Sequence, residues 1–224
     1  MTAPCALLFD LDGTLVDSAQ GIAAALGRLA QERGGAGPDV AHVRRLVSQG
    51  AATLVAQGLG PLAQNSAADI ARFRAILTKL PANPAMIYPG VRAALTHLAA
   101  AGHPMAIVTN KPAALAQQLL ADLDLASFFA ALVGGDTLPV AKPNPAPLTH
   151  ALALLGHPAH AAIMIGDSAA DAAAAAAAHL PFVLYAGGYG ADETATLPQA
   201  AQFTDFAQLP ALIAALPVAK SPPA

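Results

Sequence analysis

The stretch FDLDGTLVDS spans residues 9–18 and places two aspartates, Asp10 and Asp12, directly after an apolar run that begins at Cys5. Apolar residues that lead into a Gly-Thr turn are typical of a buried strand followed by a loop. In an open α/β sheet, ligands bind outside the carboxyl ends of the strands. We therefore expect these carboxylates where such a sheet carries out chemistry, although Asp and Gly also occur in ordinary turns. Buried carboxylates need a positive partner, and hard oxygen ligands suit Mg²⁺.

Three further polar clusters lie downstream. Two of them follow short apolar runs, as the first cluster does, and the other lies between strand-like and helix-like segments beside prolines. Phosphoryl transfer needs a nucleophile, a metal site and groups that stabilise charge on the phosphoryl oxygens. The downstream clusters add a hydroxyl, an amide, a lysine and two carboxylates to this set, which are Thr109, Asn110, Lys142, Asp167 and Asp171.

The order and spacing of the four clusters resemble the four motifs of the haloacid dehalogenase (HAD) superfamily of phosphatases over nearly the whole chain. Within that superfamily the chain is most similar to the bacterial phosphoglycolate phosphatases, and this likeness rests on residues 134–139, 142–148 and 187–190. The resemblance implies a Mg²⁺-dependent phosphomonoester hydrolase that forms an aspartyl-phosphate intermediate. The substrate it implies is 2-phosphoglycolate, which would be converted to glycolate and phosphate.

The resemblance also implies roles for the acidic residues. Asp10 would be the nucleophile and a Mg²⁺ ligand through its carboxylate. Asp12 would be the general acid and then the general base, and its main-chain carbonyl would bind Mg²⁺. Asp167 would complete the metal ligands. Asp171 would orient the metal site or Lys142. Alternatively, Asp171 has no catalytic role and is simply an acidic residue in the first turn of a helix, where the helix dipole favours negative charge.

The same likeness assigns phosphate-binding groups. Thr109 would donate a hydrogen bond to a phosphoryl oxygen, helped by the backbone of Asn110, and Lys142 would neutralise phosphoryl charge. The alternatives are a helix cap at Thr109 and a solvated loop lysine at Lys142. Segment 43–51 resembles the cap segment of phosphoglycolate phosphatases, in which Arg44 would clamp a substrate carboxylate. This chain has Ser-Gln-Gly at 48–50 where the family usually has Gly-Asn-Gly, so Arg44 is equally well interpreted as an ordinary surface charge.

The pattern of elements predicts an α/β fold with a doubly wound, Rossmann-like parallel sheet and an inserted α-helical cap domain. Strand-like runs separated by helical periodicity occur at 5–9, 105–108, 131–133, 161–165 and 182–185.

No strand-like run occurs between residues 17 and 81, where the periodicity is helical throughout. We therefore assign 17–86 to a helical cap domain and both 1–16 and 87–216 to the α/β core domain. The last segment, 217–224, is expected to be a disordered tail.

The composition limits the kinds of molecule that the protein is expected to bind. The chain has 224 residues, a formal net charge of −3 and no basic block, which argues against nucleic-acid binding. No apolar run approaches the length of about 18 residues that a membrane span needs, and no signal peptide is visible. The single cysteine, Cys5, excludes an internal disulfide. We expect a cytoplasmic protein that acts on a small phosphate ester, and the sequence leaves its oligomeric state open.

Several other functions stay open at this point. The substrate could be a sugar phosphate or pyrophosphate, and the reaction could be that of a hexose-phosphate mutase. A dehalogenase is disfavoured because dehalogenases of this fold lack the second acid, which is Asp12 here. A non-catalytic binding protein on the same scaffold is a further alternative, since a fold does not define a function.

Overall fold

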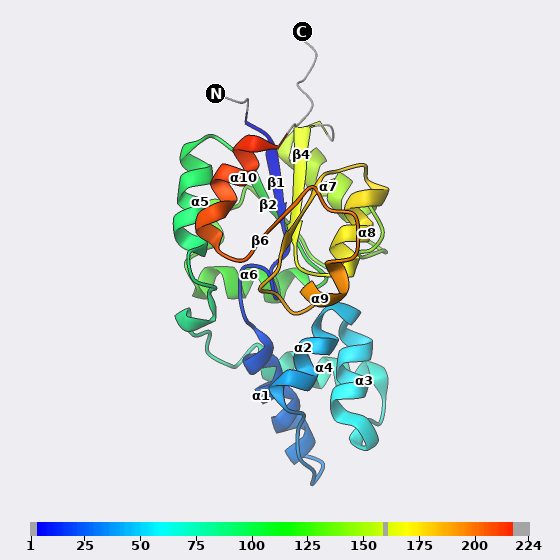
Figure 1. Cartoon of the computed structure of the whole chain (residues 1–224). Helices are drawn as coiled ribbons and strands as arrows, with labels where there is room; N and C mark the ends of the chain where they lie inside the picture. Colours follow the sequence, from blue (N-terminus) through cyan, green and yellow to red (C-terminus); the bar gives the residue numbers. More distant parts are fainter. Residues whose placement is uncertain (1–3, 159–160, 217–224) are drawn as a thin grey trace.

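The computed structural model describes residues 4–158 and 161–216. Six parallel strands form one sheet in the order β3-β2-β1-β4-β5-β6 (Figure 1). The strand order reverses between β1 and β4, which is the place where doubly wound sheets bind ligands. The strands are β1 (Ala6–Phe9), β2 (Met105–Val108), β3 (Ala131–Val133), β4 (Ala162–Gly166), β5 (Phe182–Tyr185) and β6 (Ala201–Phe203).

Helices cover both faces of the sheet, which explains why its strands are almost continuously apolar. In β1, Leu7 and Phe9 pack on one face, and Ala6 and Leu8 pack on the other. Figure 1 shows α5 and α10 on one side of the sheet and α7 and α8 on the opposite side. The first face is covered by α5 (Val91–Ala100), α6 (Ala113–Asp122) and α10 (Leu209–Ala215), and the second by α7 (Ala146–Leu155) and α8 (Ala169–Ala177).

The predicted α/β fold with its doubly wound parallel sheet is confirmed, and two short elements were not predicted. These are β6 and the single-turn helix α9 (Ala191–Thr194). The edge strand β6 has three residues and only Phe203 is buried, so it offers no apolar run for a sequence pattern to detect. The predicted tail, 217–224, lies outside the described residues. No helix among the described residues is both long and apolar enough to span a membrane.

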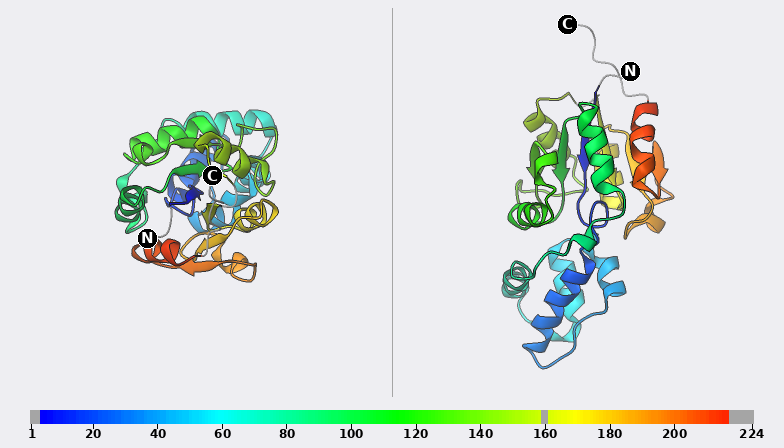
Figure 2. Two further views of the ribbon diagram at one scale, coloured as in Figure 1. Left: turned by 90° about the horizontal axis from the view of Figure 1, so that it is seen from above. Right: turned by 90° about the vertical axis from the view of Figure 1, so that its left-hand side faces the viewer.

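Four helices between β1 and α5 form a second apolar cluster of their own. Figure 2 shows this helical unit beyond the carboxyl-end edge of the sheet. Its core is built largely from helix-spaced side chains such as Ile22, Leu26 and Leu29. The helices are α1 (Ala19–Gln31), α2 (Val40–Leu46), α3 (Ala51–Leu59) and α4 (Ser66–Leu77).

The chain enters and leaves the helical unit at adjacent points. Val16 pairs with Ile87 in an isolated antiparallel bridge, and the N–H of Asp17 donates to the carbonyl of Met86 over 2.7 Å. The division that we placed at 16/17 and 86/87 falls at this pair of crossings. We keep it as a proposal for the domain boundaries.

A buried ion pair joins α4 to the turn after α1. Arg33 Nη2 lies 2.6 Å from Asp69 Oδ1, and the N–H of Gln64 donates to Asp69 Oδ2 over 2.8 Å. The hydrogen bonds from Arg33 and Gln64 lower the pKa of Asp69 from 3.8 to about 2. Its folded-state pKa is therefore below the unfolded value, so the contribution of Asp69 to stability is present above about pH 4 and is lost as the pH falls through 2.

We predict that Asp69→Asn lowers the melting temperature at pH 6, because it removes the charged partner of Arg33. The difference from the wild type should shrink as the pH falls from 4 through 2, because the unfolded and then the folded wild-type carboxylate take up a proton in this range. Thermal unfolding of both proteins across this range measures the effect. A difference that stays constant down to pH 2 would contradict the assignment.

Candidate active site

Parallel pairing of β1 with β4 brings the two principal acids together. Phe9 is in register with Ile165, and the N–H of Asp10 donates to the carbonyl of Ile165 over 2.9 Å. Asp10 and Asp167 are therefore placed side by side where the strand order reverses, although 156 residues separate them in the sequence.

Three buried carboxylates form a compact cluster at this edge. Asp10, Asp167 and Asp171 each offer an oxygen, and these oxygens lie within 4.8 Å of one another. Burial is the main cause that raises the pKa of Asp10 to about 6, and the Lys142 ammonium partly opposes it. Burial, together with the charges of Asp171 and Asp10, raises the pKa of Asp167 to about 8. The cluster thus carries more negative charge than its buried surroundings readily accept.

The donor set of this cluster fits a hard divalent cation. Asp10 Oδ1 is buried and has no hydrogen-bond partner among the described residues. Both oxygens of Asp171 already accept hydrogen bonds, from Lys142 Nζ over 2.6 Å and from Ser168 Oγ over 2.7 Å. Asp10 is consequently a better ligand than Asp171, since oxygen donors with excess negative charge are what such cations prefer.

Two loops pack tightly against Asp167 and orient it. Thr14 Oγ1 donates to Asp167 Oδ1 over 2.7 Å, and the N–H of Tyr189 donates to Asp167 Oδ2 over 2.8 Å. Glycine is required at two of these contacts, because a Cβ at Gly13 would lie 2.5 Å from Asp167 Oδ2 and one at Gly188 would lie 2.2 Å from Asp167 Cβ. Gly13 also has a φ of +86°, in the region that favours glycine.

Lys142 is the cation inside the carboxylate cluster. Its Nζ donates to Asp171 Oδ1 and to the carbonyl of Val108, each over 2.6 Å, and lies 3.1 Å from Asp10 Oδ1. The neighbouring carboxylates raise the pKa of this lysine in spite of its burial, so it stays charged. The side chain of Asn110 fixes the main chain of Lys142. It accepts a hydrogen bond from the Lys142 N–H over 3.0 Å and donates one to the Lys142 carbonyl over 2.9 Å.

A cavity of about 270 Å³ opens in front of these groups. Thr109 lines it and is buried, and its Oγ1 accepts from the N–H of Lys111 over 3.2 Å. Ser48, from the helical unit, closes the opposite side. The cavity therefore joins the sheet edge to the helical unit, and its polar lining consists of Asp10, Asp12, Ser48, Thr109, Asn110, Lys111, Lys142 and Ser168.

Asp12 lies on the same cavity as Asp10 but has different neighbours. Lys111 Nζ lies 3.0 Å from both carboxylate oxygens of Asp12, and the hydroxyl of Ser18 donates to Oδ1. Ser18 begins α1, yet its side chain makes no cap hydrogen bond, because the hydroxyl is used by Asp12 instead. The two aspartates of the 9–18 stretch thus have separate environments, one in the carboxylate cluster and one facing Lys111.

The sequence patterns assigned no role to Lys111 or Tyr189. Lys111 directly follows the predicted site residues Thr109 and Asn110, and Tyr189 lies in segment 187–190, which carries part of the family resemblance. The hydroxyl of Tyr189 donates to Asp17 Oδ1 over 2.7 Å, so the loop that orients Asp167 also contacts the start of the helical unit. A signal was available for Lys111, which directly follows Thr109 and Asn110 and is the only charged residue of that cluster.

Arg44 lies away from the polar cavity. Its Nη2 forms an ion pair with Asp17 Oδ2 at 2.6 Å, and its guanidinium carbon lies 6.0 Å from the centre of the Tyr189 ring. The side chain is 44% exposed and is not among the described residues that line the cavity. The structure therefore brings together all the predicted site residues except Arg44, whose role as a clamp stays a prediction.

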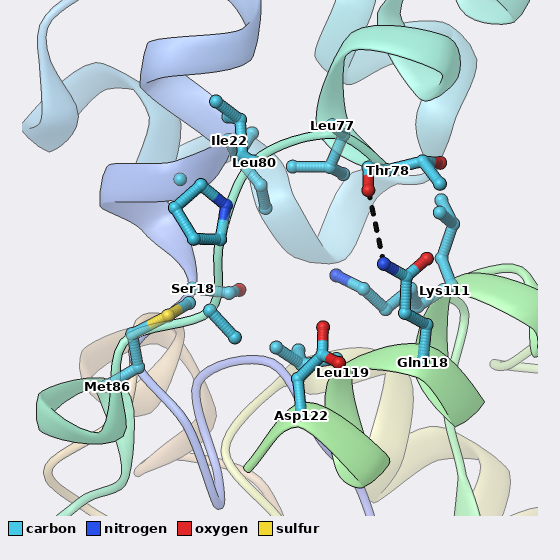
Figure 3. A pocket seen from close by; sticks show the side chains of 14 residues that line it. Ser18, Ile22, Leu77, Thr78, Leu80, Met86, Lys111, Gln118, Leu119 and Asp122 are labelled. Carbon is cyan, nitrogen blue, oxygen red and sulfur yellow. Dashed lines mark hydrogen bonds between the residues drawn. The ribbon is translucent and has the colours of Figure 1, made fainter.

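A larger and mostly apolar pocket of about 500 Å³ lies beside the site, between the helical unit and α6. Figure 3 shows Ile22, Leu77 and Leu80 of the helical unit across this pocket from Leu119 and Asp122 of α6. Gln118 Nε2 donates to the carbonyl of Thr78 over 3.1 Å and ties the two sides together. None of the three clustered aspartates lines this pocket, so the chemistry belongs to the smaller, polar cavity.

Comparisons with known proteins agree with this geometry. The family model described as haloacid dehalogenase-like hydrolase matches residues 6–179. Phosphoglycolate phosphatases from Rhodospirillum rubrum and Rhodobacter capsulatus are both 42% identical to the chain, over 215 and 217 residues. These matches cover 92% and 93% of this chain and 89% and 96% of the relatives.

Solved structures show the same architecture. A crystal structure of a predicted phosphoglycolate phosphatase from Haemophilus somnus 129PT has a TM-score of 0.79 and 26% identity, and covers 95% of this chain and 99% of its own. A haloacid dehalogenase-like hydrolase from Bacteroides fragilis has a TM-score of 0.77 and 26% identity, with coverage of 92% and 99%. The family match spans well over half of the chain, and the chain therefore belongs to the haloacid dehalogenase-like hydrolases.

Proposed function

We propose that the protein is a Mg²⁺-dependent phosphomonoesterase that forms an aspartyl-phosphate intermediate on Asp10. The observation that carries this proposal is the pair of acids on one cavity. Asp10 Oδ1 lies 3.1 Å from Lys142 Nζ but accepts no hydrogen bond from the described residues, and Asp12 faces Lys111 and Ser18. One acid is thereby arranged for attack on phosphorus and the other for proton transfer.

The reaction follows from these positions. A carboxylate oxygen of Asp10 attacks phosphorus, the bond from phosphorus to the ester oxygen breaks, and Asp12 gives its proton to that oxygen as the alcohol leaves. Asp12 then takes a proton from water, whose oxygen attacks the aspartyl phosphate and releases inorganic phosphate. The pKa of Asp10, at about 6, leaves the nucleophile largely ionised at neutral pH.

The remaining groups stabilise charge. Lys142 and the hydroxyl of Thr109 would contact the phosphoryl oxygens, where positioned charges and donors act most strongly in a buried site. Mg²⁺ would be held by the carboxylates of Asp10 and Asp167 and by the main-chain carbonyl of Asp12, and when bound it neutralises charge on the transferring phosphoryl group. Asp171 would act through Lys142, which it contacts directly.

The substrate we propose is 2-phosphoglycolate. The support is that relatives 42% identical over more than nine-tenths of the chain carry the name phosphoglycolate phosphatase. A sugar phosphate or pyrophosphate is the alternative within the same chemistry. A non-catalytic protein is disfavoured by the complete set of acids and the lysine, and a hexose-phosphate mutase is a less favoured alternative. A cytoplasmic location stays a prediction.

The test is phosphate release from 2-phosphoglycolate, measured with Mg²⁺ and with a chelator, beside a panel of sugar phosphates and pyrophosphate. We expect a kcat/KM of about 10⁴ M⁻¹s⁻¹ or more that exceeds the panel and is lost on chelation. Stronger turnover of another ester would retain the chemistry and replace the substrate. Absence of turnover across the panel would contradict the proposal.

The variant Asp10→Asn should lower kcat by at least about 10³-fold, because the amide is no nucleophile. Far-UV circular dichroism should be unchanged, since Asp10 contributes only its backbone N–H to the pairing with β4. Mass spectrometry of the wild type quenched during turnover should detect a phosphorylated Asp10. Activity near the wild-type level would contradict the aspartyl-phosphate assignment.

We expect Asp171→Asn to lower kcat by about 10- to 100-fold, because Lys142 loses a charged partner that orients it. Asp171 also caps α8 through Ser168, so helix stability must be separated from the effect on the lysine. Asp205→Asn is the matched control, since Asp205 Oδ1 accepts from the N–H of Ala207 at another helix start, away from the cavity. Equal losses of kcat in the two variants would show that capping alone explains the result.

A further inference from the structure

A second cavity of about 450 Å³ adjoins the polar one. The two cavities share Asp12, Val47, Asn110 and Lys111. A molecule that fills the polar cavity and extends past Lys111 therefore enters this second space. Apolar side chains make up most of its remaining lining, and the large ones are Ile22, Leu54, Phe73, Leu77 and Leu115.

One charged side chain from the helical unit lines this apolar space. Arg74 lies in the last turn of α4, and its Nε is buried without a hydrogen-bond partner among the described residues. Its guanidinium forms no ion pair within 4–158 and 161–216. Arg33 and Arg72 of the same unit are ion-paired, with Asp69 and Glu32. Arg28 and Arg45 form no ion pair among the described residues, but neither lines one of the two cavities.

An unpartnered donor in such a place is costly. A buried donor without a partner carries a penalty that a bound acceptor removes, and hydrogen bonds to charged groups are stronger than neutral ones. A planar guanidinium matches the two oxygens of a carboxylate. The negative end of the helix dipole stabilises the positive charge of Arg74, which lies in the last turn of α4. The dipole does not supply a hydrogen-bond acceptor for the buried Nε.

We propose that Arg74 binds the carboxylate of the substrate, at the end remote from the phosphoryl group. This inference rests on the proposed function, because it takes the phosphoryl group to be held at Asp10 and Lys142. The other cations near the two cavities already have carboxylate partners. Lys111 contacts both oxygens of Asp12, and Arg44 is paired with Asp17 outside the polar cavity. Arg74 is a specificity-determining residue that acts on substrate binding.

The experiment compares kcat/KM for 2-phosphoglycolate with that for ethyl phosphate, which is similar in size and lacks the carboxylate. We expect Arg74→Met to lower the ratio of kcat/KM for 2-phosphoglycolate to kcat/KM for ethyl phosphate by about 10- to 100-fold, because a hydrogen bond to a charged group is lost. Arg74→Lys should recover part of the ratio. The matched control is Arg72→Met on the same helix, which removes an exposed arginine paired with Glu32 and should leave the ratio unchanged.

The outcomes separate this inference from the proposed function. If wild-type protein prefers 2-phosphoglycolate and Arg74→Met keeps that preference, the inference is wrong and the proposed function stands. A loss of preference in Arg44→Met alone would also overturn it, in favour of the clamp that the family resemblance implies.

Binding is measured separately, so that the result does not depend on turnover. Calorimetric titration of 2-phosphoglycolate into Asp10→Asn and into Asp10→Asn/Arg74→Met should give a Kd that is about 10- to 100-fold weaker for the double variant. Equal Kd values, or no binding to either protein, would overturn the inference. A clear difference together with an inactive wild type would support Arg74 and refute the phosphatase proposal.

Discussion

Three carboxylates and one ammonium group are buried together at the carboxyl edge of the sheet, and the rest of the site is organised around that excess of negative charge. Removing a charge from water is costly unless a partner meets it, and here Lys142 balances only part of the total. The raised pKa values of Asp10 and Asp167 express the same imbalance. A divalent cation would relieve this imbalance, so the cluster could hold one.

The second acid differs from the first because of what surrounds it. Asp12 lies outside the carboxylate cluster, where Lys111 and a hydroxyl from the start of α1 hold it. Two aspartates only two residues apart can therefore carry different tasks, one as nucleophile and one as proton donor. The helical unit contributes to both environments, because Ser18 contacts Asp12 and Ser48 lines the cavity in front of Asp10.

Much of the fold and of the carboxylate cluster could be predicted from the sequence. Apolar runs of four or five residues that end in Asp10, Thr109 and Asp167 mark strand ends, and parallel strands bring such ends to one edge. The edge strand β6 escaped prediction because it buries only Phe203. Contacts such as that of Tyr189 with Asp17 join residues far apart in the chain, and no local pattern encodes them. The likeness to known phosphatases pointed to Arg44, whereas Arg74 lines the second cavity, because that cavity lies where α4 faces the residues that follow β2.

The sequence by itself determined five of the six strands, the helical insertion and the identity of the acids, because periodicity and strand-end chemistry are local properties of a chain. Tertiary structure alone decided which of these acids share a buried cluster, which lysine contacts each of them, and which arginine has a buried donor without an acceptor among the described residues. Those outcomes depend on burial and on distances of a few ångströms between distant segments, and electrostatic energies in a protein interior are governed by both.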